Sequence, residues 1–202
     1  MADLLSAPLD VLANLGLLLV QDKTLPNVVT IVTGDRVAGS WWSHPKGRLV
    51  FAVVSRLEDH PDVVFTKLVN GKVTLVHRRL WPALAAVGSA REPWQLDGLS
   101  AAARRLLGKV DRSGEVRVAG APVKELERKL LVHSEQVHTE SGRHETRIES
   151  WQAWARRVGV EPSRSAAVGR QRLEEAAAAI GAPSSALPWR AIRAKVTPPA
   201  AL

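Results

Sequence analysis

The stretch VVFTKLVNGKVTLVHRRLWPAL, residues 63–84, carries the clearest local signal in the chain. Two runs rich in β-branched residues flank Asn70 and Gly71, a pair that suits a type I′ turn because both of its central residues need a positive φ. The stretch therefore predicts a β-hairpin, with Lys67 and Lys72 on either side of its tip. The basic pair of HRRLW and a short helix, LWPALAAVG, follow the hairpin directly.

The segment before this hairpin predicts a helix. Within GSWWSHPKGRLVFAVVSRLEDHPD, residues 39–62, Leu49, Val53 and Leu57 recur at spacings of four, and Phe51 and Val54 widen the apolar stripe. Further upstream the sequence predicts a helix over about 8–14 and a short apolar strand in LLLVQD. The segment LPNVVTIVTGD fits either a strand or a helix, with the helix favoured by its proline near the start and glycine near the end.

The second half repeats this order of elements. A polar segment, SAREPWQLDG (89–98), precedes a helix capped by Ser100, the short strand EVRV and a helix in VKELERKLLV. The stretch VHSEQVHTESGRHETRIESW (132–151) then alternates as two strands that turn at Ser141 and Gly142. Helix, strand, helix and hairpin is the order of a winged-helix module.

The predicted fold class is α+β, with tandem winged-helix-like lobes and short β-hairpins. Residues 1–90 form the first lobe, 91–158 the second winged-helix-like lobe, and 159–202 a basic helical tail. The boundary after residue 90 coincides with a change in charge, because the net charge is +2 before it and +6 after it.

Composition points to an anionic partner. The net charge is +8, and arginine, which suits bidentate phosphate and base-edge contacts, outnumbers lysine 20 to 8. We expect nucleic acid to be the partner, with DNA favoured over RNA. A high-GC genome, which raises the arginine content of all proteins, remains an alternative explanation.

The chain contains no cysteine, which excludes disulfides, thiolate catalysis and cysteine-ligated zinc. The N-terminus lacks the features of a signal peptide, and no apolar run is long enough to span a bilayer. These observations predict a cytoplasmic protein with no membrane association, no cofactor and no metal; the oligomeric state is left open.

Four groups of basic or aromatic residues are candidates for nucleic-acid contact. The stretch GSWWSHPKGR (39–48) combines two adjacent tryptophans with two basic residues, which suits base stacking, although the tryptophans also fit a purely structural role. The two hairpins and the HRRLW stretch supply further basic groups. The predicted contacts are Trp41, Trp42, Lys46, Arg48, Lys67, Lys72, Arg78, Arg79, Arg143 and Arg147.

The histidines and glutamates of residues 132–151 suggest an alternative, a small hydrolase or DNA-modifying enzyme. His133, His138 and Glu140 are its candidate catalytic residues, and a divalent metal is an optional part of this alternative. Their spacing matches no metal-binding signature such as HExxH, so the polar wing of a hairpin is favoured over a metal site. No P-loop, GxGxxG or GxSxG motif is present.

The segments GSWWSHPKG, NGKVTLVHRRLWPAL and LLVHSEQVHTESGRHETRIESW resemble the block pattern of a widespread family of uncharacterised bacterial proteins. The second half also resembles the winged-helix modules of AlkZ-like DNA glycosylases. The first resemblance implies no particular activity. The second does not imply glycosylase activity, because the catalytic glutamine-containing motif of that group has no counterpart here. The charge, the arginine excess and the two wing-like hairpins lead us to expect a role in DNA repair, genome maintenance or regulation.

Three hypotheses about function therefore follow. The favoured one is a DNA-binding protein built from winged-helix-like lobes. The second is the enzyme built on the histidine and glutamate cluster. The third is a protein–protein adaptor that uses the tryptophan-rich stretch 39–48 as its anchor.

Overall fold

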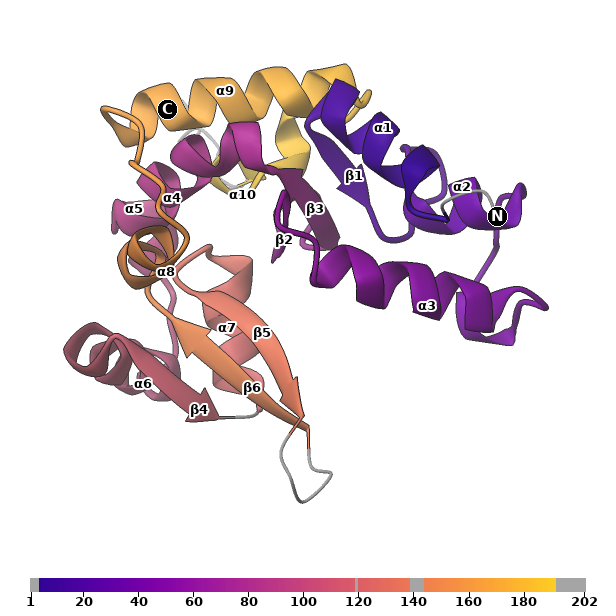
Figure 1. Ribbon diagram of the computed structural model, residues 1–202. Coiled ribbons are helices and arrows are strands. Elements are labelled where there is room, and N and C mark those ends of the chain that lie inside the picture. Colours follow the sequence, from indigo (N-terminus) through magenta and orange to yellow (C-terminus); the bar gives the residue numbers. More distant parts are fainter. Residues whose placement is uncertain (1–3, 119, 139–143, 192–202) are drawn as a thin grey trace, which may run out of the picture.

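The computed structural model describes residues 4–118, 120–138 and 144–191. It contains two three-stranded antiparallel sheets, each packed against helices (Figure 1). The helices are α1 (Ser6–Leu15), α2 (Val28–Thr33), α3 (Gly47–Glu58), α4 (Trp81–Ser89), α5 (Pro93–Leu96), α6 (Ala101–Ser113), α7 (Ala121–Arg128), α8 (Trp151–Arg157), α9 (Ala166–Ala179) and α10 (Pro188–Ala191). The strands are β1 (Leu17–Leu19), β2 (Val63–Lys67), β3 (Val73–His77), β4 (Glu115–Val118), β5 (His133–His138) and β6 (His144–Glu149). The predicted α+β class is confirmed.

The first sheet has the strand order β1-β3-β2, and its hairpin is the one that the sequence predicts. Asn70 and Gly71 both have positive φ, 53° and 65°, and the amide of Lys72 donates to the carbonyl of Val69, as a type I′ turn requires. The paired strand ends at Lys67, two residues earlier than the alternation suggests. Val69 and its neighbour Leu68 are instead fully buried in the core beneath the C-terminal helices.

The ambiguous segment LPNVVTIVTGD contains the helix α2. The side chain of Asn27 accepts a hydrogen bond from the amide of Thr30, and Gly34 ends the helix in the left-handed conformation. These two capping residues outweigh the strand propensity of the β-branched residues between them. The favoured helical interpretation is confirmed.

The second sheet has the order β4-β6-β5, and its register sorts the side chains by chemistry. One face carries Val116, Ile148 and Val118, which pack on α6 and α7 in a separate core. The opposite face carries charged residues and a histidine. The helix α6 begins where Ser100 caps it, with the serine side chain accepting from the amide of Ala103.

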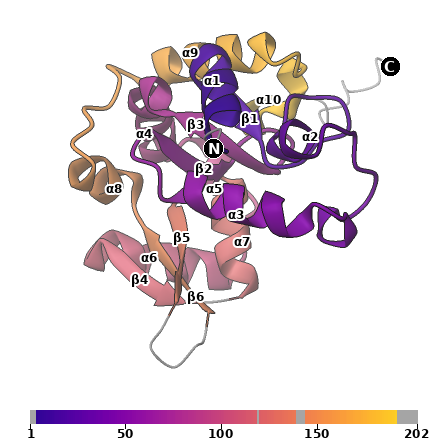
Figure 2. The ribbon, with the colours of Figure 1, turned by 45° about the vertical axis from the view of Figure 1, so that its right-hand side comes forward.

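The C-terminal segment packs on the first sheet's side of the molecule. In both ribbon views α9 lies along α4, and the β5–β6 hairpin points away at the opposite end (Figures 1 and 2). The two helices approach closely at Gly169, where an added Cβ would lie 2.7 Å from the carbonyl oxygen of Ala83. One core therefore contains residues from β1, β3, α4, α8 and α9, so residues before 90, between 91 and 158, and after 159 share it.

The segment 89–98 joins the two sheets through buried contacts. It contains α5, and its Gln95 is fully buried, with a side-chain amide that donates to the carbonyls of Gly88, Lys129 and Leu130. Lys67 of β2 forms an ion pair with Glu127 of α7 across the same junction. The two sheets are thus held together by specific polar contacts. Within the described ranges, no helix is both long enough and apolar enough to cross a membrane.

Candidate functional sites

The helix α3 presents one polar and aromatic face to solvent. Val50, Val53 and Leu57 are buried against the first sheet. The exposed side chains recur at spacings of three, four and seven on the other side of the helix and are Arg48, Phe51, Ala52, Arg56 and Glu58. The prediction that Phe51 widens the buried stripe is wrong, because this side chain is 51% exposed.

The predicted tryptophan pair lies beside this face. Trp41 and Trp42 form a short 3-10 helix capped by Ser40, and their rings stack with centroids 4.2 Å apart at an interplanar angle of 22°. Trp42 is 64% exposed and also contacts Phe51, with ring centroids 5.4 Å apart. An exposed aromatic platform therefore adjoins the N-terminal end of α3, close to Arg48 in the sequence.

Most of the other predicted contacts are engaged within the protein. Arg78 pairs with Asp62 at 3.2 Å, yet its side chain remains 56% exposed. The remaining pairings are Lys46 with the carbonyl of Thr33, Lys67 with Glu127, Lys72 with Asp22, Arg79 with the carbonyls of Ala13 and Asn14, and Arg147 with Glu135 and Glu115. Arg143 lies outside the described residues. Arg48 is thus the predicted cation whose side chain has no partner among the described residues.

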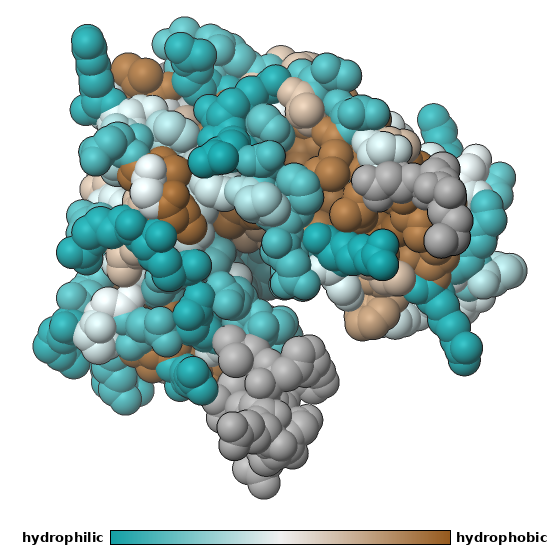
Figure 3. All heavy atoms as spheres, viewed as in Figure 1, coloured by the Kyte–Doolittle hydropathy of each residue, from teal (hydrophilic) through white to brown (hydrophobic). Residues whose placement is uncertain are grey.

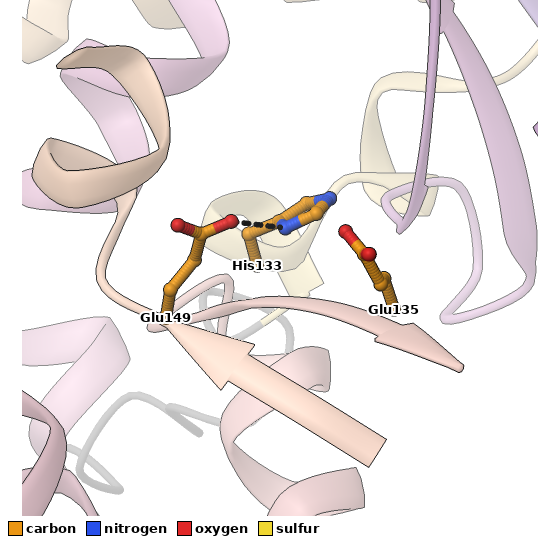
Figure 4. Close-up of side chains that lie close together, drawn as sticks. All are labelled: His133, Glu135 and Glu149. Atoms are coloured by element: carbon orange, nitrogen blue, oxygen red, sulfur yellow. Dashed lines mark hydrogen bonds and ion pairs between the residues drawn. The ribbon is translucent and has the colours of Figure 1, made fainter. Parts of the chain in front are cut away.

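A second group of residues gathers on the charged face of the second sheet. The register of β5 and β6 places His133 opposite Glu149, and the ring Nδ1 lies 3.2 Å from Glu149 Oε1 (Figure 4). Both side chains are buried, with exposed fractions of 8% and 4%. Arg157 of α8 forms a further ion pair with Glu149. The rings of Trp151 and Trp154 contact the histidine ring, with ring centroids 5.7 and 5.6 Å away.

The partners of Glu149 determine its ionisation. Burial alone would raise the pKa of its carboxyl, but the hydrogen bonds from His133 and Arg157 outweigh burial and lower the pKa from 4.5 to about 2. The carboxylate is therefore ionised at neutral pH and accepts hydrogen bonds only. It follows that Nδ1 of His133 carries a proton, since that nitrogen must donate.

The sequence predicts that His133 and Glu135 share a strand face, and the structure confirms this. Sequence reasoning missed Glu149, because only the strand register shows that it faces His133. A nitrogen of His133 and one oxygen from each carboxylate lie within 4.8 Å of one another. Arg147 already pairs with Glu135, and Arg157 with Glu149, so a metal ion would have to compete with two guanidinium groups.

The rest of the proposed catalytic cluster does not join this group in the described structure. The backbone of His138 pairs with that of His144 at the far end of the hairpin, five residues along the strand from His133. The side chain of His138 and the whole of Glu140 lie outside the part that the structure describes. The enzymatic hypothesis based on these residues stays a prediction.

A pocket of about 610 Å³ lies between the two groups of residues. The C-terminal end of α3 and strand β2 form one wall, and β5 with α8 forms the other. The space-filling view shows that the surface is hollowed between the arm carrying β5 and β6 and the part carrying α3 (Figure 3). Ser55 from α3 and His133 from β5 both line this pocket.

The chain was also compared with known proteins. Its sequence matches no protein-family model and no curated protein, and its fold matches no solved structure.

Proposed function

We propose that the protein binds DNA through the exposed face of α3 and the neighbouring Trp42. The observation that carries the proposal is the pair Arg48 and Arg56, two exposed arginines on one helix face whose side chains have no partner among the described residues. Such unpaired guanidinium groups can bond phosphate oxygens or base edges without breaking contacts within the protein.

The order of elements supports α3 as the helix that enters a DNA groove. The chain runs α1, β1, α2, α3 and then the β2–β3 hairpin, with β1 beside β3. This is the order expected of a winged-helix domain, a relative of the helix-turn-helix, in which the second helix of the pair lies in the major groove. The connection from α2 to α3 spans 34–46, longer than a simple turn, and it carries the tryptophan pair.

The exposed tryptophan refines the proposal. An aromatic ring that is free on one side stacks on an unpaired base, and such stacking contributes about 1–3 kcal/mol per base. Trp42 has the exposure needed for this contact, while Trp41 supports it from behind. We therefore expect the protein to bind single-stranded or distorted DNA at least as well as an intact duplex.

Replacing both Arg48 and Arg56 with alanine is expected to weaken DNA binding about ten-fold or more at low salt, because two phosphate or base contacts are lost. The slope of log K against log salt concentration should fall by about 2. Fluorescence anisotropy with a labelled 20-bp duplex and the matching single strand, from 50 to 200 mM salt, measures both quantities.

The matched control removes the same charge elsewhere. Arg164 and Arg172, near and on α9, are also exposed and have no side-chain partner among the described residues. Their double alanine variant should bind DNA nearly as well as the unchanged protein. If the two variants lose DNA affinity equally, binding depends on net charge and not on the α3 face. If the unchanged protein does not bind DNA at 50 mM salt, the proposal is wrong. If Trp42→Ala alone abolishes a protein–protein interaction, the adaptor hypothesis is favoured.

A further inference from the structure

A small pocket at the junction of α4 and α8, two helices that pack together (Figure 1), contains two buried polar atoms that no described residue bonds. Its volume is about 220 Å³. The two atoms are Oγ of Ser89, at the end of α4, and the indole nitrogen Nε1 of Trp151, at the start of α8. Trp151 is only 1% exposed. A buried indole N–H usually finds a hydrogen-bond partner, so these two atoms indicate that the pocket has an occupant.

The packing of Trp151 explains why no protein group reaches its nitrogen. An added Cβ at Gly88 would lie 2.5 Å from Nε1, so this nitrogen lies directly against the backbone of α4 at a residue that also lines the pocket. Ser89 is the next residue in the chain. Asp111 and Gln152 line the pocket as well, and both are exposed, so the pocket is open to solvent on their side.

The two unpartnered atoms determine what the occupant must offer. An indole N–H is a donor only, and a serine hydroxyl group can donate or accept. A ligand atom that contacts both Trp151 Nε1 and Ser89 Oγ must therefore accept hydrogen bonds, as an oxygen atom with free lone pairs does.

Arg91 adds a permanent positive charge to the lining. A guanidinium group stays protonated and has five N–H donors in a planar arrangement that matches a carboxylate. Among the described residues, this one contacts the carboxylate of Asp111 and the carbonyl of Leu131, which leaves N–H donors for a ligand. The side chain is 29% exposed, so its charge is only partly screened by water.

Charge and size narrow the occupant further. Because Asp111 pairs with Arg91, the pocket is close to neutral before a ligand enters, and a dianion such as phosphate would be repelled by Asp111. The pocket volume exceeds the roughly 30 Å³ that one water molecule takes up in the liquid, and it lies below the roughly 300 Å³ at which pockets for drug-sized ligands begin. A monoanion with few non-hydrogen atoms fits both limits.

We propose that this pocket binds a small organic molecule through a carboxylate group. One carboxylate oxygen accepts hydrogen bonds from Trp151 Nε1 and Ser89 Oγ, and the other accepts from the guanidinium group of Arg91. The residues of the α3 face do not line this pocket, so carboxylate binding does not depend on DNA binding.

Nuclear magnetic resonance of the isotopically labelled full chain tests the proposed hydrogen bond directly. Titration with sodium acetate should move the indole N–H signal of Trp151 downfield in a saturable way, with a Kd of about 10 mM or lower. Acetamide has nearly the same size but no charge to pair with Arg91, so it should bind at least about ten-fold more weakly. The indole signal of the exposed Trp42, far from this pocket in the sequence, should not move.

Two substitutions test the lining residues. Ser89→Ala should weaken acetate binding about three-fold or more without lowering the free energy of unfolding, because its hydroxyl group has no partner among the described residues to lose. Asp111→Asn should strengthen acetate binding about three-fold, because it removes a negative charge that competes for Arg91. Asp35→Asn removes an equal charge from an exposed position outside the pocket and should leave the Kd unchanged.

Three outcomes would overturn the proposal. If the Trp151 signal does not move at about 10-fold the expected Kd of acetate, the pocket holds water only. If acetamide or sodium chloride moves this signal as much as acetate does, the pocket does not select a carboxylate. If Ser89→Ala and Asp111→Asn both bind acetate as Asp35→Asn does, acetate binds elsewhere. Circular dichroism of each variant establishes that the variants are folded.

Discussion

Replacing Gly88 with alanine is expected to destabilise the protein by about 3 kcal/mol or more, since a methyl group at this position has no space. An added Cβ would lie 2.2 Å from Cδ1 and 2.4 Å from Cγ of Trp151. That ring is 1% exposed and packs edge-on against Trp154, so it cannot move aside without opening the core that joins α4 and α8. For a protein of this size the midpoint of thermal unfolding should fall by about 10 °C. Thermal and urea unfolding followed by tryptophan fluorescence measure the effect.

The control is a glycine in another helix. An added Cβ at Gly108 of α6 would meet only Arg112, at an ordinary contact distance of 3.5 Å. Alanine there should stabilise the protein by about 0.5–1 kcal/mol, because it restricts the unfolded chain and favours the helix. If both substitutions lowered the free energy of unfolding, the close packing of Trp151 on α4 would not explain the effect of Gly88→Ala.

The local elements were predictable because their signals lie close together in the sequence. Asn70 and Gly71 determine a turn between two strands whatever packs on them, and Ser100 caps α6 through the amide of a residue three positions later. The alternation in residues 133–149 was also enough to predict that His133 and Glu135 share a face. Each of these features depends on a few neighbouring residues.

Features that depend on distant residues were not predictable. Periodicity places Phe51 at the edge of an apolar stripe, but whether that edge is covered depends on the sheet and the loop that pack on α3. The strand at Val63–Lys67 stops early because the C-terminal segment reaches the hairpin, where the carbonyl of Ala186 accepts from the amide of Asn70. The chain gives no local sign of that contact.

The same distinction applies to the candidate sites. Adjacent tryptophans and arginine counts suggested an interface, but they could not tell which basic groups remain unpaired. Lys67 and Arg147 are engaged by Glu127 and Glu135, residues far from them in the sequence, whereas Arg48 is not. Exposed cations without a partner among the described residues also occur on α6 and α9, so the α3 face is distinguished by the exposed Trp42 that adjoins its arginines.

Replacing Glu149 with glutamine should lower the free energy of unfolding at pH 7 by about 3 kcal/mol, because it removes the charge that pairs with Arg157 and His133 inside the protein. Because glutamine has nearly the same volume as glutamate, packing is preserved. The decrease in the free energy of unfolding therefore measures the contribution of the charge. Urea unfolding of both proteins at pH 7 measures the difference. Glu161→Gln, at an exposed carboxyl, is the control and should leave the free energy of unfolding unchanged.

The dependence on pH tests the cause of this loss. Folding lowers the pKa of Glu149 from 4.5 to about 2, so the folded state binds its proton less readily than the unfolded state. The stabilisation is therefore complete above pH 4.5 and disappears as the pH falls toward 2. The unchanged protein and Glu149→Gln should differ in stability at pH 7 and at pH 5, and the difference should shrink steadily between pH 4.5 and pH 2.5. A stability difference that stays constant over that interval would mean that the glutamine variant loses packing rather than charge. It would also contradict the conclusion that Glu149 is ionised and accepts a hydrogen bond from Nδ1 of His133.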